Sequence, residues 1–174
     1  MVGLKTGMLR DRRTYLLAVL FLLAACKHPT KTKEWPAGMT AEPAEQVVAR
    51  VRAPGAVTLF VIYASWCTSC RKELPMIGEL SSAYAKKGMR VVALSTDEDP
   101  QDYAEMLADH PLPFPLLRLS AQGSLPAAVK SYGGTYHGVI PYTALFDRTG
   151  ALVKEWPEGN ATKPALEAAL APLL

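Results

Sequence analysis

Residues 57–70 read VTLFVIYASWCTSC and place two cysteines directly after a long apolar run. The β-branched and aromatic run Val57–Tyr63 predicts a strand that is buried on both faces. Helical periodicity begins after the first cysteine, so Cys67 is expected at a helix N-terminus. Unpaired N–H groups and the helix dipole favour an anion there, and the thiolate is the form of cysteine that attacks disulfides. The stretch therefore predicts a reactive dithiol at a strand-to-helix junction.

Patterns of strands and helices alternate on both sides of this stretch. Further strands are predicted at 90–95 and 114–119, with a hairpin at 142–146 and 151–156. Helices are predicted after residues 44, 67, 99 and 124 and at the C-terminus. Such alternation implies a parallel sheet, here completed by an antiparallel hairpin and a last helix. The predicted fold class is α/β, with a central mixed β-sheet flanked by helices.

The N-terminal residues have the composition of an export signal. The formal net charge of +3 comes from residues 1–25, which hold four basic side chains and one acidic one. The apolar run at 15–25 is too short for a membrane span, which needs about 20 residues, and suits a secretory signal. Without these residues the charge is balanced, which excludes a basic surface for nucleic acid.

The signal closes with LAAC at residues 23–26, which resembles the bacterial lipobox. The resemblance implies lipid transfer to Cys26 and cleavage before it; an ordinary signal peptide that happens to contain a cysteine is the alternative. We therefore expect a signal peptide at 1–25, a lipidated cysteine and flexible tether at 26–43, and a folded domain at 44–174. The protein is then expected in the cell envelope, held on a bacterial membrane through the lipid on Cys26.

The chain has three cysteines. If Cys26 carries a lipid, Cys67 and Cys70 are the one remaining pair. Two cysteines are too few for a disulfide framework or a four-ligand zinc site. We expect no cofactor and no metal.

Several motifs together resemble the thioredoxin superfamily. These are Trp66 before the Cys-x-x-Cys pair, Ile140-Pro141 about 70 residues later, and an Asp-x-x-Gly turn that begins at Asp147. The segment at about 96–119 and the run RKELP at 71–75 are similar to membrane-tethered TlpA/ResA-type thiol-disulfide oxidoreductases. The resemblance covers residues 44–174 and implies a thioredoxin-like fold with a TlpA-type αβ insertion.

The resemblance also implies roles for single residues. Cys67 is expected to attack the substrate and Cys70 to resolve the mixed disulfide. Trp66 is expected to form an apolar platform beside the sulfur. Pro141 matches the family's cis-proline, and Ile140 before it is expected to offer its backbone to an extended substrate. These three residues are the predicted substrate-binding set.

Glu73 aligns with a glutamate that ResA-like proteins hold near the active site. A partly buried carboxyl group there can exchange a proton with the resolving thiol. Many thioredoxins place a buried aspartate six residues before the first cysteine, where this chain has Val61. Either Glu73 or solvent then exchanges the proton, and we predict Glu73 as the proton-transfer residue; a solvated helix charge is the alternative.

The expected function is disulfide exchange with protein thiol or disulfide substrates outside the cytoplasm. The family implies net reduction, as in the maturation of cytochrome c, with electrons from a membrane thiol carrier. Two alternatives stay open. A copper-delivery factor would use the dithiol as a ligand, with His137 as the histidine able to assist. A thioredoxin-fold peroxidase would need a Pro-x-x-x-Thr-x-x-Cys context, which the residues before Cys67 lack.

Overall fold

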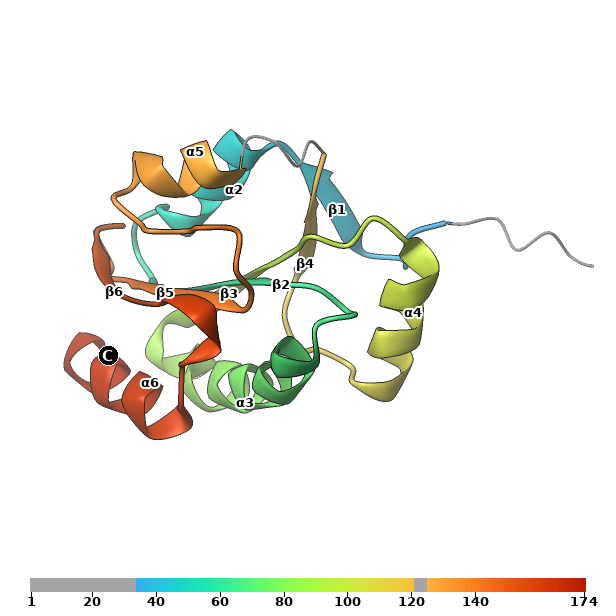
Figure 1. The fold of residues 1–174 in the computed structure, drawn as a ribbon. Coiled ribbons are helices and arrows are strands. Elements are labelled where there is room, and N and C mark those ends of the chain that lie inside the picture. The colour runs from blue at the N-terminus through green and yellow to red at the C-terminus, as the bar shows by residue number, and fades with distance from the viewer. Residues whose placement is uncertain (1–33, 121–124) are drawn as a thin grey trace, which may run out of the picture. The chain divides into compact units, whose positions relative to one another are not determined.

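The strand β2 (Val57–Tyr63) lies at the centre of the fold, and every one of its residues is buried. The structure, a computed structural model, describes residues 34–120 and 125–174. In these residues six strands form one sheet in the order β1-β4-β3-β2-β5-β6 (Figure 1). Neighbouring strands among β1, β4, β3 and β2 pair in parallel. β5 pairs antiparallel with β2 on one side and with β6 on the other. The predicted mixed sheet is confirmed. The strands are β1 (Met39–Glu42), β2, β3 (Met89–Ser95), β4 (Leu116–Leu119), β5 (Tyr142–Phe146) and β6 (Leu152–Trp156).

Helices cover both faces of this sheet (Figure 1). The helices are α2 (Ala44–Val51), α3 (Thr68–Tyr84), α4 (Pro100–Asp109), α5 (Leu125–Ser131) and α6 (Lys163–Leu170). Alternate residues of β2 serve the two faces, since successive side chains of a strand point in opposite directions. Leu59 and Val61 pack with α3, α4 and α6. Phe60 and Ile62 pack with α2 and α5. The strand is apolar throughout because both of its faces are core.

The insertion expected at about 96–119 is α4 followed by β4. Asp99 begins α4 by accepting a hydrogen bond from the N–H of Gln101 at 2.8 Å, and Pro100 follows at the first helical position. This is a usual N-terminal sequence for a helix. From α4, Tyr103 and Met106 enter the same core as α3. The insertion is therefore packed against the helix that begins at the cysteines.

The expected tether at 26–43 is wrong at its C-terminal end. Met39–Glu42 is a strand that pairs with β4 in parallel. Trp35 also packs against the core, with its ring 5.9 Å from that of Tyr103. The sequence pattern does not reveal β1 because it is a short edge strand whose middle residues are exposed. The folded domain thus begins before residue 44.

The expected signal peptide at 1–25 and the lipid-accepting Cys26 lie outside the described residues. In the part of the chain that the structure does describe, no helix has both the length and the apolar character needed to cross a membrane.

Candidate functional site

Cys67 and Cys70 form a disulfide at the start of α3, with their Cα atoms 5.2 Å apart. Cys67 is the residue that caps the helix: its Sγ accepts a hydrogen bond from the N–H of Cys70 at 3.1 Å. Its carbonyl oxygen accepts the N–H of Arg71 at 3.0 Å. The sulfur of Cys67 therefore lies where the helix N-terminus favours a negative charge. Cys67 is also the more accessible of the two, with 8% of its surface exposed against none for Cys70.

The loop before β5 brings a backbone carbonyl to the same sulfur. The Ile140–Pro141 peptide bond is cis, as the resemblance implied. The Sγ of Cys67 lies 3.8 Å from the carbonyl oxygen of Ile140. The carbonyl of Pro141 accepts the N–H of Gly159 at 2.8 Å, which ties the loop to the turn after β6. Residues 73 positions apart in the sequence thus meet at the disulfide.

Trp66 is the most exposed large apolar side chain of the described region, at 66%. The described residues with exposed large apolar side chains also include Val139, which precedes Ile140. Two of these apolar groups therefore lie on the segments that meet at Cys67. Beside Trp66 is a cleft of about 210 Å³ whose charged lining residues are Arg71 on α3 and Asp102, Glu105 and Asp109 on α4.

Glu73 is buried, with 7% of its surface exposed, on the α3 face that also carries Cys70. Its Oε1 accepts a hydrogen bond from the Oγ1 of Thr143 at 2.5 Å. Burial raises the pKa of Glu73 because it disfavours the charged form, and the bond from Thr143 offsets part of that rise. The alternative of a solvated helix charge is wrong.

Glu73 is held close to Val61, the position at which many thioredoxins have an aspartate. Val61 pairs directly with Thr143 across β2 and β5. Thr143 is the residue that holds the carboxyl group of Glu73. The carboxyl group of Glu73 thus comes from α3 and is anchored on the strand next to Val61.

Sequence reasoning missed a second buried carboxyl group. Asp97, which is 4% exposed, follows β3 and accepts hydrogen bonds from Ser65 and Ser95. Part of the signal is in the sequence, because Ser65 and Asp97 each come two residues after the end of a predicted strand. The structure supplies the rest: Tyr63 pairs with Ser95, which brings the two residues together. Polar residues that follow neighbouring parallel strands meet at the same edge of the sheet.

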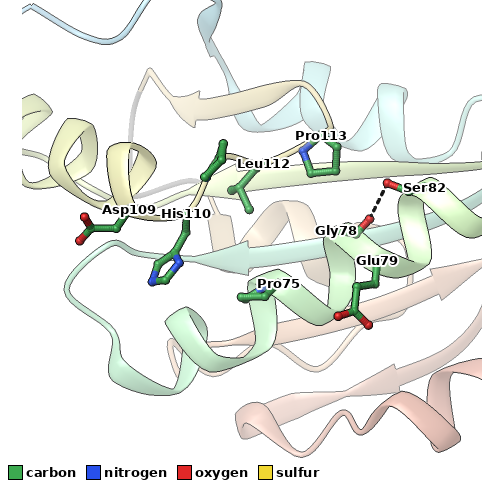
Figure 2. Close-up of a pocket in the computed structure, with 9 residues that line it drawn as sticks. Pro75, Gly78, Glu79, Ser82, Asp109, His110, Leu112 and Pro113 are labelled. Carbon is green, nitrogen blue, oxygen red and sulfur yellow. Dashed lines mark hydrogen bonds between the residues drawn. The ribbon is translucent and has the colours of Figure 1, made fainter.

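A larger cleft, of about 520 Å³, lies between α3 and the segment after α4. Figure 2 shows Pro75 on α3 close to His110 on that segment, with Glu79 further along the helix. Pro75 lies inside α3, where it removes one backbone donor. None of the residues expected to act in catalysis or substrate binding lines this cleft.

His137, on which the copper alternative depended, lies in the loop before Ile140. In the residues that the structure describes, no three His, Cys, Asp or Glu side chains are grouped so that they could hold a metal ion.

Comparison with known proteins adds three findings. The Redoxin family matches residues 31–170. The thiol-disulfide oxidoreductase ResA of Bacillus thuringiensis subsp. konkukian is 31% identical over 105 residues, which are 60% of this chain and 56% of that protein. ResA of Geobacillus thermodenitrificans is 29% identical over 101 residues, 58% of this chain and 53% of the relative. The chain thus matches little more than half the length of these curated relatives.

Solved structures agree on the fold. A candidate thiol:disulfide interchange protein DsbE from Chlorobium tepidum superposes with a TM-score of 0.58 and 26% identity, over 80% of this chain and 99% of that one. StoA from Bacillus subtilis superposes with a TM-score of 0.52 and 24% identity, over 67% of this chain and 83% of its own.

Proposed function

Because the chain belongs to the Redoxin family and is a ResA/TlpA-like member of the thioredoxin superfamily, we propose that it is a thiol-disulfide oxidoreductase that reduces protein disulfides. The observation that carries the proposal is the geometry of Cys67. Its sulfur caps α3, is the more exposed of the pair and lies 3.8 Å from the Ile140 carbonyl beside the cis-proline. Such a sulfur is both activated and within reach of a partner.

The reaction begins from the reduced dithiol. The Cys67 thiolate attacks one sulfur of the substrate disulfide, a new S–S bond forms, and the other substrate sulfur leaves as a thiolate. Cys70 then loses its proton and attacks the Cys67 sulfur. This step releases the second substrate sulfur and closes the Cys67–Cys70 disulfide that the structure contains. Two electrons have passed from the protein to the substrate.

Cys70 needs a proton acceptor because it is fully buried. Glu73 is three residues further along α3, and residues at that spacing share a helix face. Its pKa is raised by burial, so its carboxyl group exchanges protons closer to neutral pH than an exposed glutamate does. We propose that Glu73 takes the Cys70 proton during resolution and returns it when the disulfide is reduced.

Trp66, Ile140 and Pro141 are the proposed substrate contacts. The exposed ring of Trp66 offers an apolar surface beside Cys67. The backbone of Ile140 offers hydrogen-bonding groups to an extended segment, since Pro141 has no N–H of its own. A substrate bound in this way is recognised through the main-chain atoms next to its own cysteine.

The proposed location is the bacterial cell envelope. The export signal at residues 1–25 and the lipobox-like sequence that ends at Cys26 support it. A lipid on Cys26 would hold the protein on a membrane, where a membrane thiol carrier would reduce the Cys67–Cys70 disulfide again. Protein disulfides of the same compartment, such as those at haem-attachment cysteines, are the proposed substrates.

The direction of electron flow is tested by the reduction potential of the Cys67–Cys70 pair. Equilibration with defined ratios of reduced and oxidised glutathione, followed by thiol counting, measures it. A reductase is expected at or below about −200 mV, within the range of thioredoxin and the glutaredoxins. A value near −120 mV, that of a strong oxidant, would overturn the reductive direction while leaving the exchange chemistry in place.

A further inference from the structure

Asp97 has an unusually complete set of hydrogen bonds for a buried side chain. Its Oδ1 and Oδ2 lie 3.0 and 2.9 Å from the backbone N of Ser65. The Ser65 hydroxyl donates to Oδ1 at 2.6 Å, and the Ser95 hydroxyl donates to Oδ2 at 2.6 Å. Burying a carboxylate is costly unless it is bonded in this way. The mechanism described above makes no use of this group.

The bonds of Asp97 act on the turn that leads into the reactive cysteine. The carbonyl of Ala64 accepts the N–H of Cys67 at 3.2 Å, which closes a four-residue turn from Ala64 to Cys67. Ser65 is the second residue of that turn and is 2% exposed, whereas the third, Trp66, is 66% exposed. The N–H of Ser65 needs an acceptor because it is buried. Asp97 supplies that acceptor from the neighbouring strand end.

The end of β3 is itself fixed against β2. The N–H of Thr96 donates to the carbonyl of Tyr63 at 2.8 Å, and the Thr96 hydroxyl donates to the same oxygen at 3.2 Å. The N–H of Asp97 donates to the hydroxyl oxygen of Ser95 at 2.9 Å. These bonds hold the Asp97 side chain in one place relative to β3, and its bonds to Ser65 then fix the turn relative to that strand.

We propose that Asp97 is a positioning residue for disulfide exchange: it fixes the Ala64–Cys67 turn so that the Cys67 sulfur stays at the N-terminus of α3 and Trp66 points outward. The inference rests on the proposed function for its meaning, since an aligned thiolate matters for an exchange reaction. It adds a residue from the loop after β3, outside both the Cys-x-x-Cys segment and the proline loop.

Positioning and charge have opposite effects on Cys67, which makes the inference testable. Removing a nearby negative charge stabilises a thiolate and lowers the thiol pKa. Loosening the turn moves the sulfur away from the Cys70 N–H and the helix dipole, and so raises the pKa toward the ordinary value of about 8.5. The other charged side chains beside the turn line the cleft at Trp66 and are kept in every variant; they are those of Arg71, Asp102, Glu105 and Asp109.

The experiment measures the alkylation rate of Cys67 against pH in the reduced full-length chain, with mass spectrometry to separate it from the other cysteines. We expect Asp97→Ala to raise the Cys67 pKa, with about a tenfold loss of thiolate for each unit at a pH below that pKa. Asp97→Asn keeps one acceptor for the Ser65 N–H and is expected to give a value between those of the wild type and Asp97→Ala.

Glu98→Gln is the matched control, because it removes the same charge from an exposed neighbour on the same loop. It is expected to leave the Cys67 pKa unchanged. An unchanged or lowered Cys67 pKa in Asp97→Ala would overturn the proposal. A wild-type value already near 8.5 would do the same. If Asp97→Ala does not fold, Asp97→Asn decides alone, and a value at or below that of the wild type overturns the proposal.

The two proposals fail separately. A wild-type chain that reduces no protein disulfide refutes the proposed function, whereas the comparison of Cys67 pKa values stands without any substrate.

Discussion

The buried carboxyl group of Glu73 makes the stability of this protein depend on pH in an unusual direction. Burial raises its pKa in the folded state above the value of about 4.3 expected in the unfolded chain. Between these two values the folded protein binds the proton and the unfolded chain does not. Stability contributed by this group is therefore full below the unfolded pKa and is lost as pH rises through the folded pKa. Most paired carboxylates behave in the opposite way.

We predict that Glu73→Gln removes this loss. The amide is uncharged, has nearly the same shape and can still accept the hydroxyl of Thr143, which lies 2.5 Å from the Glu73 oxygen. At a pH above the folded pKa of Glu73, the variant should be more stable than the wild type by about 1.4 kcal/mol for each unit by which folding raises that pKa. At a pH below about 4 the difference should shrink toward zero, because both side chains are then neutral.

The assay is urea unfolding of the oxidised protein from acid to neutral pH, combined with an NMR titration of the Glu73 carboxyl group. The titration gives the folded pKa, and the unfolding curves must reproduce the free-energy difference that it implies. Glu79→Gln is the control: Glu79 is on the same helix but is exposed and paired with Lys163 at 2.8 Å. Exposed pairs of this kind are screened by solvent and contribute little to stability.

Two results would refute the reasoning about Glu73. One is a difference between the Glu73→Gln variant and the wild type that stays constant with pH. The other is a wild type that gains stability through this group as pH rises. Either would mean that burial does not control the ionisation of Glu73, and its proposed exchange of protons with Cys70 would lose its basis.

Two further substitutions test the packing that positions the site. Gly150→Ala should destabilise the protein by more than the roughly 1–2 kcal/mol of left-handed backbone strain, because the new Cβ would lie 2.1 Å from the Arg52 carbonyl oxygen. Gly133→Ala is the control and should cost only that strain, because Gly133 has a φ of +88° and open space around it. Equal losses of stability for the two variants in thermal unfolding would contradict the clash at Gly150. Tyr103→Phe should lower the free energy of unfolding by about 1–3 kcal/mol, because it leaves the buried hydroxyl of Tyr63 without its partner at 2.6 Å. Adding Tyr63→Phe should restore stability, because it removes the unpaired hydroxyl. No recovery in the double variant would speak against this reason.

The sequence revealed the parts of the fold that depend on local pattern. Val57–Tyr63 is the central strand with the predicted bounds, and the hairpin of β5 and β6 forms around the predicted turn at Asp147. Both are apolar runs bounded by clear turn residues. The resemblance, rather than any local pattern, indicated the cis bond before Pro141.

Features that depend on long-range pairing were not visible in the same way. β1 exists because β4 presents an edge to pair with, and its own sequence is short and half polar. The Thr143 bond that holds Glu73 joins residues 70 positions apart. The network of Asp97 and Ser65 needs the register of β2 against β3, which periodicity alone does not give. Sequence patterns assign each of these residues to a strand, helix or loop. The pairing of the strands in the sheet then decides which of them come into contact.

In the proposed mechanism Cys67 attacks the substrate disulfide and Cys70 resolves the mixed disulfide. The direct test is to express Cys70→Ala and Cys67→Ala in a bacterial envelope, quench with acid and an alkylating agent, and separate the proteins without reductant. Cys70→Ala should accumulate mixed disulfides with other proteins through Cys67, because the resolving thiol is missing, and reductant should release them. Cys67→Ala should form far fewer, since Cys70, the remaining sulfur of the pair, is buried. Trapping by Cys67→Ala in place of Cys70→Ala, or by neither variant, would contradict the proposed mechanism.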